Sequence, residues 1–142
     1  MVIQRVNREA AERIFIVMQA NESGIAADDV VALETTAASV DGVKVVQPAT
    51  ALQAAHGVVG VADAAIAQNA YGLVQVYGYR STSRIVTTDS SYALNIALRA
   101  ASGQDYFSTQ ASTVGVVPPA VLLETHTTST GTVSKKVFLR MM

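Results

Sequence analysis

The chain has 142 residues, a formal net charge of −1, 50% hydrophobic and 15% charged residues, and no cysteine. The absence of cysteine excludes disulfides, thiolate chemistry and cysteine-ligated metal sites. The absence of a basic excess argues against a nucleic-acid partner. The length is typical of one domain with its own core, so the sequence predicts a single domain over 1–142, with 1–11 as a polar lead-in.

No stretch reaches the roughly 20 apolar residues that a membrane-spanning helix needs. The apolar run from Ile14 to Met18 is too short for a signal peptide and follows several charged residues. The sequence therefore predicts no membrane partner and synthesis in the cytoplasm.

The first predicted elements are a short helix and a strand. Asn7 could cap a short helix over 7–12. From Arg13 to Gln19 apolar residues alternate, which predicts a strand whose one face carries Ile14, Ile16 and Met18. The further strand candidates, in chain order, are 29–35, 43–47, 57–62, 71–79, 82–87, 106–107, 120–125 and 133–140.

The segments between these strands contain turn residues. Asp41-Gly42 predicts a tight hairpin turn, and Pro48 ends the strand over 43–47 because proline donates no ladder hydrogen bond. Residues 49–55 fit a helical turn or a loop, and 62–70 fit a loop with at most one helical turn. Residues 91–99 fit a strand or a helix, since their apolar positions satisfy both spacings. No repeat of fixed period is visible.

The segment 71–79 is apolar or aromatic on both faces, so we expect a central strand with Val74 and Val76 facing the core. We also expect the segments 14–18 and 137–139 to lie in one sheet, where a barrel would close and remove exposed edges. The predicted fold class is all-β: a small β-barrel or β-sandwich, β-tulip-like, with long loops and at most one or two short helices.

Four segments together resemble small β-rich virion proteins of tailed bacteriophages, and more narrowly the capsid decoration, or cement, proteins. They are Glu12–Val17, Asp28–Leu33, Ala70–Gly78 and Lys135–Arg140, and the succession of Gly57–Ala62, Ile66-Ala67 and Tyr71–Val76 is the most characteristic part. The resemblance implies an all-β fold, a homo-oligomer (often a trimer), and binding to the outer face of the major capsid protein. It implies no catalytic residue, and a place on the capsid surface of a virion assembled in the host cytoplasm.

The residues that could carry chemistry form no convincing pattern. His56 and His126 have no acidic residue at metal-ligand spacing. Asp89-Ser90-Ser91 could join a histidine in a triad, but an Asp/Ser turn is the better interpretation without a nucleophile elbow. The glycines at 57, 60, 72 and 78 match no phosphate loop and indicate bulges or close backbone approaches. We therefore predict no catalytic, cofactor-binding or metal-binding residues.

Three tyrosines, Tyr71, Tyr77 and Tyr79, are expected to share a strand face with Leu73 and Gln75. Beside Arg80 and Arg84 they could form a base-stacking platform. The net charge favours instead tyrosine rings buried in a core or a protein interface.

The expected function is that of a non-enzymatic capsid decoration protein. The alternatives are a head–tail connector, a tail accessory, or a small ligand-binding β-barrel or enzyme. A pocket for the last of these would need converging polar groups, of which the sequence has few.

Overall fold

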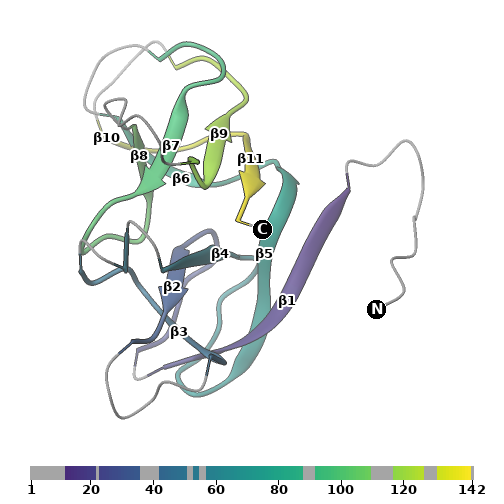
Figure 1. Ribbon diagram of the computed structural model, residues 1–142, viewed down its shortest axis with the longest axis vertical. Helices are drawn as coiled ribbons and strands as arrows, with labels where there is room; N and C mark the ends of the chain where they lie inside the picture. The colour runs from purple at the N-terminus through teal and green to yellow at the C-terminus, as the bar shows by residue number, and fades with distance from the viewer. Residues whose placement is uncertain are drawn as a thin grey trace.

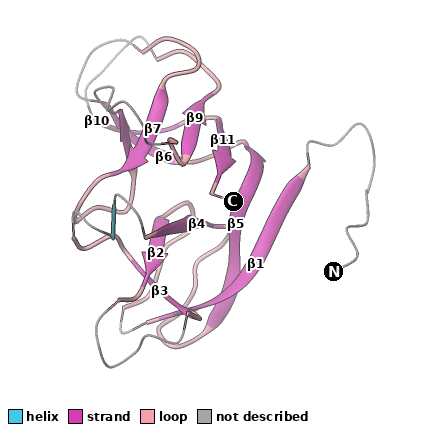
Figure 2. Cartoon of the chain, viewed as in Figure 1, coloured by secondary structure: helices cyan, strands magenta, loops and turns pink. Residues whose placement is uncertain are grey.

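The computed structural model describes residues 12–21, 23–35, 42–50, 53–54, 57–87, 92–109, 117–126 and 131–141. These residues form an all-β fold, as predicted, in which one sheet runs through eleven strands (Figures 1 and 2). The strands are β1 (Arg13–Ala20), β2 (Val30–Leu33), β3 (Lys44–Val46), β4 (Val58–Ala62), β5 (Tyr71–Arg80), β6 (Arg84–Thr87), β7 (Ala97–Ala100), β8 (Phe107–Thr109), β9 (Ala120–Leu122), β10 (Gly131–Ser134) and β11 (Val137–Arg140). The lead-in 1–11, with its predicted helix start, lies outside the described residues.

The first five strands close into a barrel, which confirms the predicted architecture. Their order is β1-β3-β2-β4-β5, and β1 pairs both with β3, in parallel, and with β5, antiparallel. Because the first strand of this order also bonds to the last, the ring has no open end. This barrel is the lower lobe of Figure 1.

The two ends of the described chain lie in the same sheet, as predicted, because both β1 and β11 pair with β5. They flank β5 on opposite edges and do not pair with each other. The predicted closure between the chain ends is therefore wrong, since the barrel closes through β1 with β3 and β5. With β4 as a third neighbour, β5 is the central strand that the sequence predicts.

The upper lobe repeats the pairing scheme of the lower one. β6 is parallel to β8, β8 is antiparallel to β7, β7 to β9, and β9 to β11. β10 returns to β6 and is separated from β11 only by Lys135 and Lys136. Together β10 and β11 take the place that β5 has in the lower lobe, while the end of β5 and β6 together take the place of β1.

The repeat holds residue by residue. Asp28 and Asn95 both have left-handed backbones, with φ of 68° and 64°. Their N–H groups donate to equivalent carbonyls, of Ala62 and Leu122, at 3.0 and 2.9 Å. The equivalent core pairs are Ala20 and Ile85, Ile25 and Tyr92, Val31 and Leu98, Val45 and Phe107, Ala62 and Leu122, Ile66 and His126, Val74 and Val137, and Val76 and Leu139. The separation within these pairs changes along the chain, so the sequence shows no fixed period.

Each lobe has its own hydrophobic core. Val74 and Val76, fully and almost fully buried, belong to the lower core, which confirms the prediction that they face inward. The upper core is built around Phe107 and also takes in Val30 and Val61 from the lower lobe. These two valines therefore pack the lobes together.

The predicted strand over 133–140 is in fact two strands. The backbone breaks at Lys135, whose N–H donates to Ser83 O at 3.0 Å, and at Lys136, whose N–H donates to Glu124 Oε1 at 3.0 Å. Before the break the chain pairs with β6, and after it with β5. The strand must break here because its pairing partner changes from β6 to β5. The alternation of apolar residues does not indicate which strand a segment pairs with.

The sequence fits either a strand or a helix over residues 91–99. The described part of this segment, 92–99, is a turn followed by a strand. Tyr92 forms an isolated bridge, Leu94 and Asn95 lie in a turn, and β7 begins only at Ala97. A strand interpretation that starts at Tyr92 is therefore wrong for the first residues. Asn95 is the reason, because asparagine tolerates the left-handed conformation that the turn requires.

Three other local predictions are confirmed, and one is wrong. Ala54 N donates to Thr50 O, and the Gln53 side chain accepts from Thr50 N, which makes a capped helical turn. Residues 63–70 form a loop without a helix. The predicted tight turn at Asp41-Gly42 does not join β2 and β3, because these strands pair antiparallel with Leu33 opposite Val45; Asp41 itself lies outside the described residues. A side chain on Gly78, which has φ of 96°, would overlap the Glu12 carbonyl, so this glycine marks a close backbone approach as predicted.

Candidate functional site

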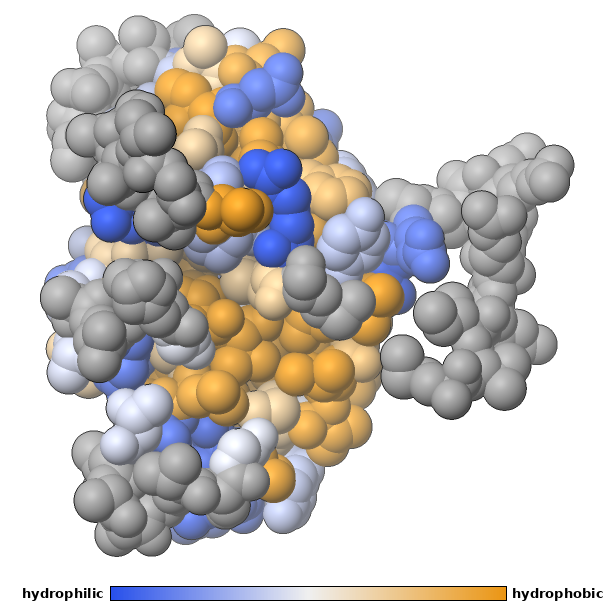
Figure 3. Space-filling model, viewed as in Figure 1, coloured by the Kyte–Doolittle hydropathy of each residue, from blue (hydrophilic) through white to orange (hydrophobic). Residues whose placement is uncertain are grey.

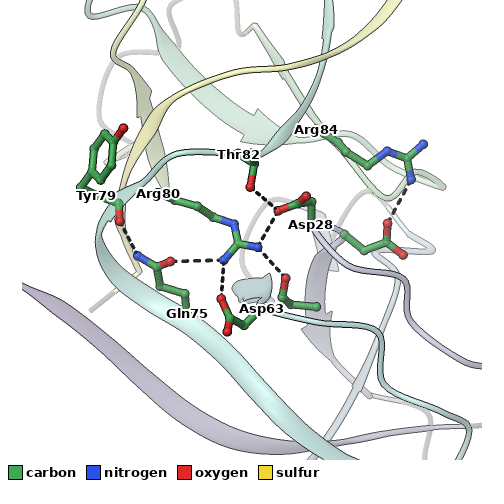
Figure 4. Close-up of polar contacts among 9 residues, drawn as sticks. Asp28, Asp63, Gln75, Tyr79, Arg80, Thr82 and Arg84 are labelled. Atoms are coloured by element: carbon green, nitrogen blue, oxygen red, sulfur yellow. Dashed lines mark hydrogen bonds and ion pairs between the residues drawn. The ribbon is translucent and has the colours of Figure 1, made fainter.

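Arg80, at the end of β5, is the centre of a polar network where the two lobes meet (Figure 4). Its Nη2 donates to Asp28 Oδ1 at 2.6 Å and to Ala62 O at 2.8 Å. Its Nη1 donates to Gln75 Oε1 at 3.2 Å and to Asp63 Oδ1 at 3.3 Å. The side chain is only 6% exposed. The guanidinium therefore holds loops before β2 and after β4 against the middle of β5.

Arg84, at the start of β6, makes a second ionic contact in the same region. It pairs with Asp29 Oδ1 at 3.0 Å and with Asp105 Oδ2. Burial raises the pKa of Asp29, although hydrogen bonds from Ala26 N and Arg84 act against it. Burial lowers the pKa of Arg84, but its bonds to Asp29 and Asp105 more than offset this, so that pKa is raised. The guanidinium and both carboxylates thus act as one charged unit.

These two arginines clamp one turn. Asp28 and Asp29 are adjacent in the turn before β2, and Arg80 and Arg84 reach them from the shared strand and from the upper lobe. We call this set, with Asp63, Gln75 and Asp105, the junction clamp. Each charge in it faces an opposite charge, so the arrangement holds the two lobes together. In the described part of the chain, no group of three His, Cys, Asp or Glu residues could hold a metal ion.

The other sequence candidates do not join this site. His126 is buried, forms a backbone bridge with Tyr92, and stacks on its ring with centroids 6.2 Å apart. It occupies the core position that Ile66 has in the lower lobe. His56 and the segment 89–91 lie outside the described residues.

A bulge in β5 overturns the expected common face of the tyrosines. Gln75 lies opposite Phe15, whereas Tyr77 lies opposite Ile14, so Val76 is an extra residue in the ladder. Side chains before and after such a bulge point to different faces. The expectation that Tyr77 shares a face with Gln75 is therefore wrong.

The three tyrosines consequently have three different environments. Tyr71 is exposed, at 64%. Tyr77 packs against the lower core, and its ring meets Phe138 edge to face at 5.3 Å. Tyr79 lies beneath the Arg13 guanidinium, 5.6 Å from the ring centroid. They form no common stacking platform, and the neighbouring Arg80 is buried.

The outer face of β1 and β5 carries exposed apolar side chains. Val17 of β1 and Leu73 of β5 are cross-strand neighbours, and their side chains are 60% and 48% exposed. Tyr71 lies two residues before Leu73 on β5, opposite Gln19. Figure 3 shows apolar residues gathered over the lower lobe. We call Val17, Tyr71 and Leu73 the β1–β5 face. Exposed apolar side chains that adjoin each other on a rigid sheet are typical of protein interaction sites.

No protein-family model matches this sequence, and no curated protein matches it. Among the described residues, no helix is long and apolar enough to cross a membrane.

Proposed function

We propose that this chain is a capsid decoration, or cement, protein without enzymatic activity, which binds the outer face of the major capsid protein lattice and stabilises the shell. The observation that carries the proposal is the β1–β5 face. It presents adjoining apolar side chains on a closed barrel, and the sequence segments that resemble decoration proteins include both strands.

The mechanism is mechanical. The junction clamp and the shared strand β5 hold the two lobes as one body, so little ordering entropy is lost when the chain binds. A standard protein interface buries roughly 1,600 Å² in total. Contacts that bridge neighbouring shell subunits add up over a lattice, and binding only to the assembled shell stabilises it by mass action.

The proposal includes the partners and the location that the resemblance implies. The major capsid protein is the partner, the chain resides on the capsid surface of the virion, and it self-associates, as a trimer in the implied arrangement. Neither nucleic acid nor membrane is a proposed partner, because the formal net charge is −1 and the arginines nearest the tyrosines in the sequence, Arg80 and Arg84, already pair with carboxylates.

The test compares particles that carry the chain with particles that lack it. Decorated particles should withstand higher temperature and a larger osmotic shock, and Leu73→Lys should abolish both binding and protection. Leu94→Lys is the matched control, because Leu94 is 55% exposed and lies in the upper lobe. Equal resistance of decorated and bare particles would remove the cement function. A few copies per particle, in place of a number near that of the shell protein, would indicate a connector or tail component.

A further inference from the structure

The outer face of the upper lobe carries a row of half-buried apolar side chains. The row crosses four neighbouring strands and consists of Tyr79 of β5, Phe138 of β11, Val121 of β9 and Ala97 of β7. On β7, β9 and β11 the neighbouring residues along each strand pack in the upper core, so the row itself faces away from that core. Figure 4 shows the Tyr79 ring pointing away from the Arg80 guanidinium.

Three arginines, Arg13, Arg99 and Arg140, border this row. The Arg13 guanidinium lies over the Tyr79 ring, 5.6 Å from its centroid. Arg140 and Arg99 each follow a member of the row by two residues, on β11 and β7, and therefore share its outward face. Arg140 N donates to Pro119 O at 2.9 Å, and the β7–β9 register, continued by one residue, places Arg99 opposite the same proline. These two arginines are thus two strand spacings apart, about 10 Å between Cα atoms. We call the row and the three arginines the arginine face.

Within the part of the chain that the structure describes, these three guanidinium groups form no ion pair, whereas Arg80, Arg84, Lys135 and Lys136 do. The carboxylates there are engaged as well: four belong to the junction clamp, Glu124 lies near two lysines, and Glu34 accepts from Asn21 Nδ2 at 2.8 Å. Only Glu12 is left among the described acidic residues, and one carboxylate cannot balance three arginines. The charge of the arginine face is therefore complementary to carboxylates of another molecule.

We propose that the arginine face binds an acidic segment of a partner protein, in which carboxylate side chains flank apolar ones. The apolar side chains of the segment cover Phe138 and Val121, and its carboxylates pair with Arg99 and Arg140. The planar guanidinium group binds a carboxylate through two parallel hydrogen bonds. Aromatic residues and arginine are also the residue types enriched where protein interfaces are most buried.

The same face is poorly suited to nucleic acid. Stacking of bases needs aromatic ring faces that are free, but the Arg13 guanidinium covers the Tyr79 ring, and Phe138 is held edge to face against Tyr77 at 5.3 Å. Three arginines on a chain of net charge −1 release few counterions from a polyphosphate backbone. An acidic peptide needs only two or three carboxylates to satisfy them.

This inference goes beyond the proposed function, because it names the chemistry of a partner segment on a surface other than the β1–β5 face. Leu73→Lys, which tests that face, should leave binding of an acidic segment unchanged. Loss of acidic-segment binding would in turn leave the contact through the β1–β5 face in place. The two proposals therefore fail independently.

A titration of the full-length protein, followed by NMR, tests the inference with a synthetic peptide of alternating glutamate and valine. Backbone amide shifts should change on β5, β9 and β11 around the arginine face. A matched peptide with glutamine in place of glutamate should bind about tenfold more weakly, because it lacks the charge-assisted hydrogen bonds. Salt should weaken binding of the acidic peptide alone, since exposed charges are screened.

The double variant Arg99→Gln with Arg140→Gln should keep the native circular dichroism spectrum and bind the acidic peptide about tenfold more weakly. Lys136→Gln is the matched control, because Lys136 is 52% exposed and already lies beside Glu124, and it should bind as the native chain does. Equal affinity for the two peptides, or a folded double variant with native affinity, would overturn the proposal. Tighter binding of a thymidine oligonucleotide of equal charge would also overturn it, in favour of a nucleic-acid site.

Discussion

Replacing Arg80 by alanine should lower the free energy of unfolding by about 2–4 kcal/mol. The buried Gln75 Oε1 loses its donor, which costs about 1–3 kcal/mol. The Ala62 carbonyl adds little because it keeps its bond from Asp28 N. Asp28 and Asp63 are 28% and 47% exposed, so water partly replaces the arginine and each ion pair counts for about 0–1 kcal/mol. The lost packing of the buried aliphatic stem supplies the rest.

Urea unfolding followed by circular dichroism measures this loss. Lys136→Ala is the matched control, because Lys136 is half exposed and lies 3.9 Å from Glu124, and it should cost less than about 1 kcal/mol. Arg80→Lys should lie between the two, since an ammonium group cannot reach both Asp28 and Gln75 as the guanidinium fork does. If Arg80→Ala proves no more destabilising than Lys136→Ala, the junction clamp does not hold the lobes together.

Two further substitutions test the core and the clamp. Val76→Asp places a charge without a partner in the lower core and should cost more than about 4 kcal/mol; a soluble variant with an unchanged melting temperature would show that the strand is exposed. The raised pKa of Asp29 means that its contribution to stability is fully present below the ordinary value of 3.8 and is lost as pH rises through the folded-state pKa. The stability of the native chain relative to Asp29→Asn should therefore increase as pH falls from 7 to about 3 in urea titrations; a difference independent of pH would contradict this.

The alternating faces of β1 and the central position of β5 could be predicted from the sequence. Alternation over Arg13–Gln19 marks the half-buried β1, and apolar residues on both faces of 71–79 mark the central β5. Both patterns are local, because side chains of a strand alternate between its two faces whichever strand lies beside it.

Other features depend on pairing partners that lie far away in the chain. The bulge at Val76, the break at Lys135 and Lys136, and the barrel closure by β3 all arise from register, which alternation does not encode. The junction clamp is a similar case, because Arg80 and its partner Asp28 are 52 positions apart.

The sequence by itself determined an all-β chain without a motif for catalysis, since strand propensity and motif spacing are properties of neighbouring residues. Only the tertiary structure decided that the fold is built twice around a shared strand. Equivalent positions such as Val45 and Phe107, or Ile66 and His126, differ in residue type and separation, so the repeat leaves no period in the sequence. It is preserved in hydrogen-bond pairing, because many different apolar residues can fill the same core position while the backbone ladder admits one register.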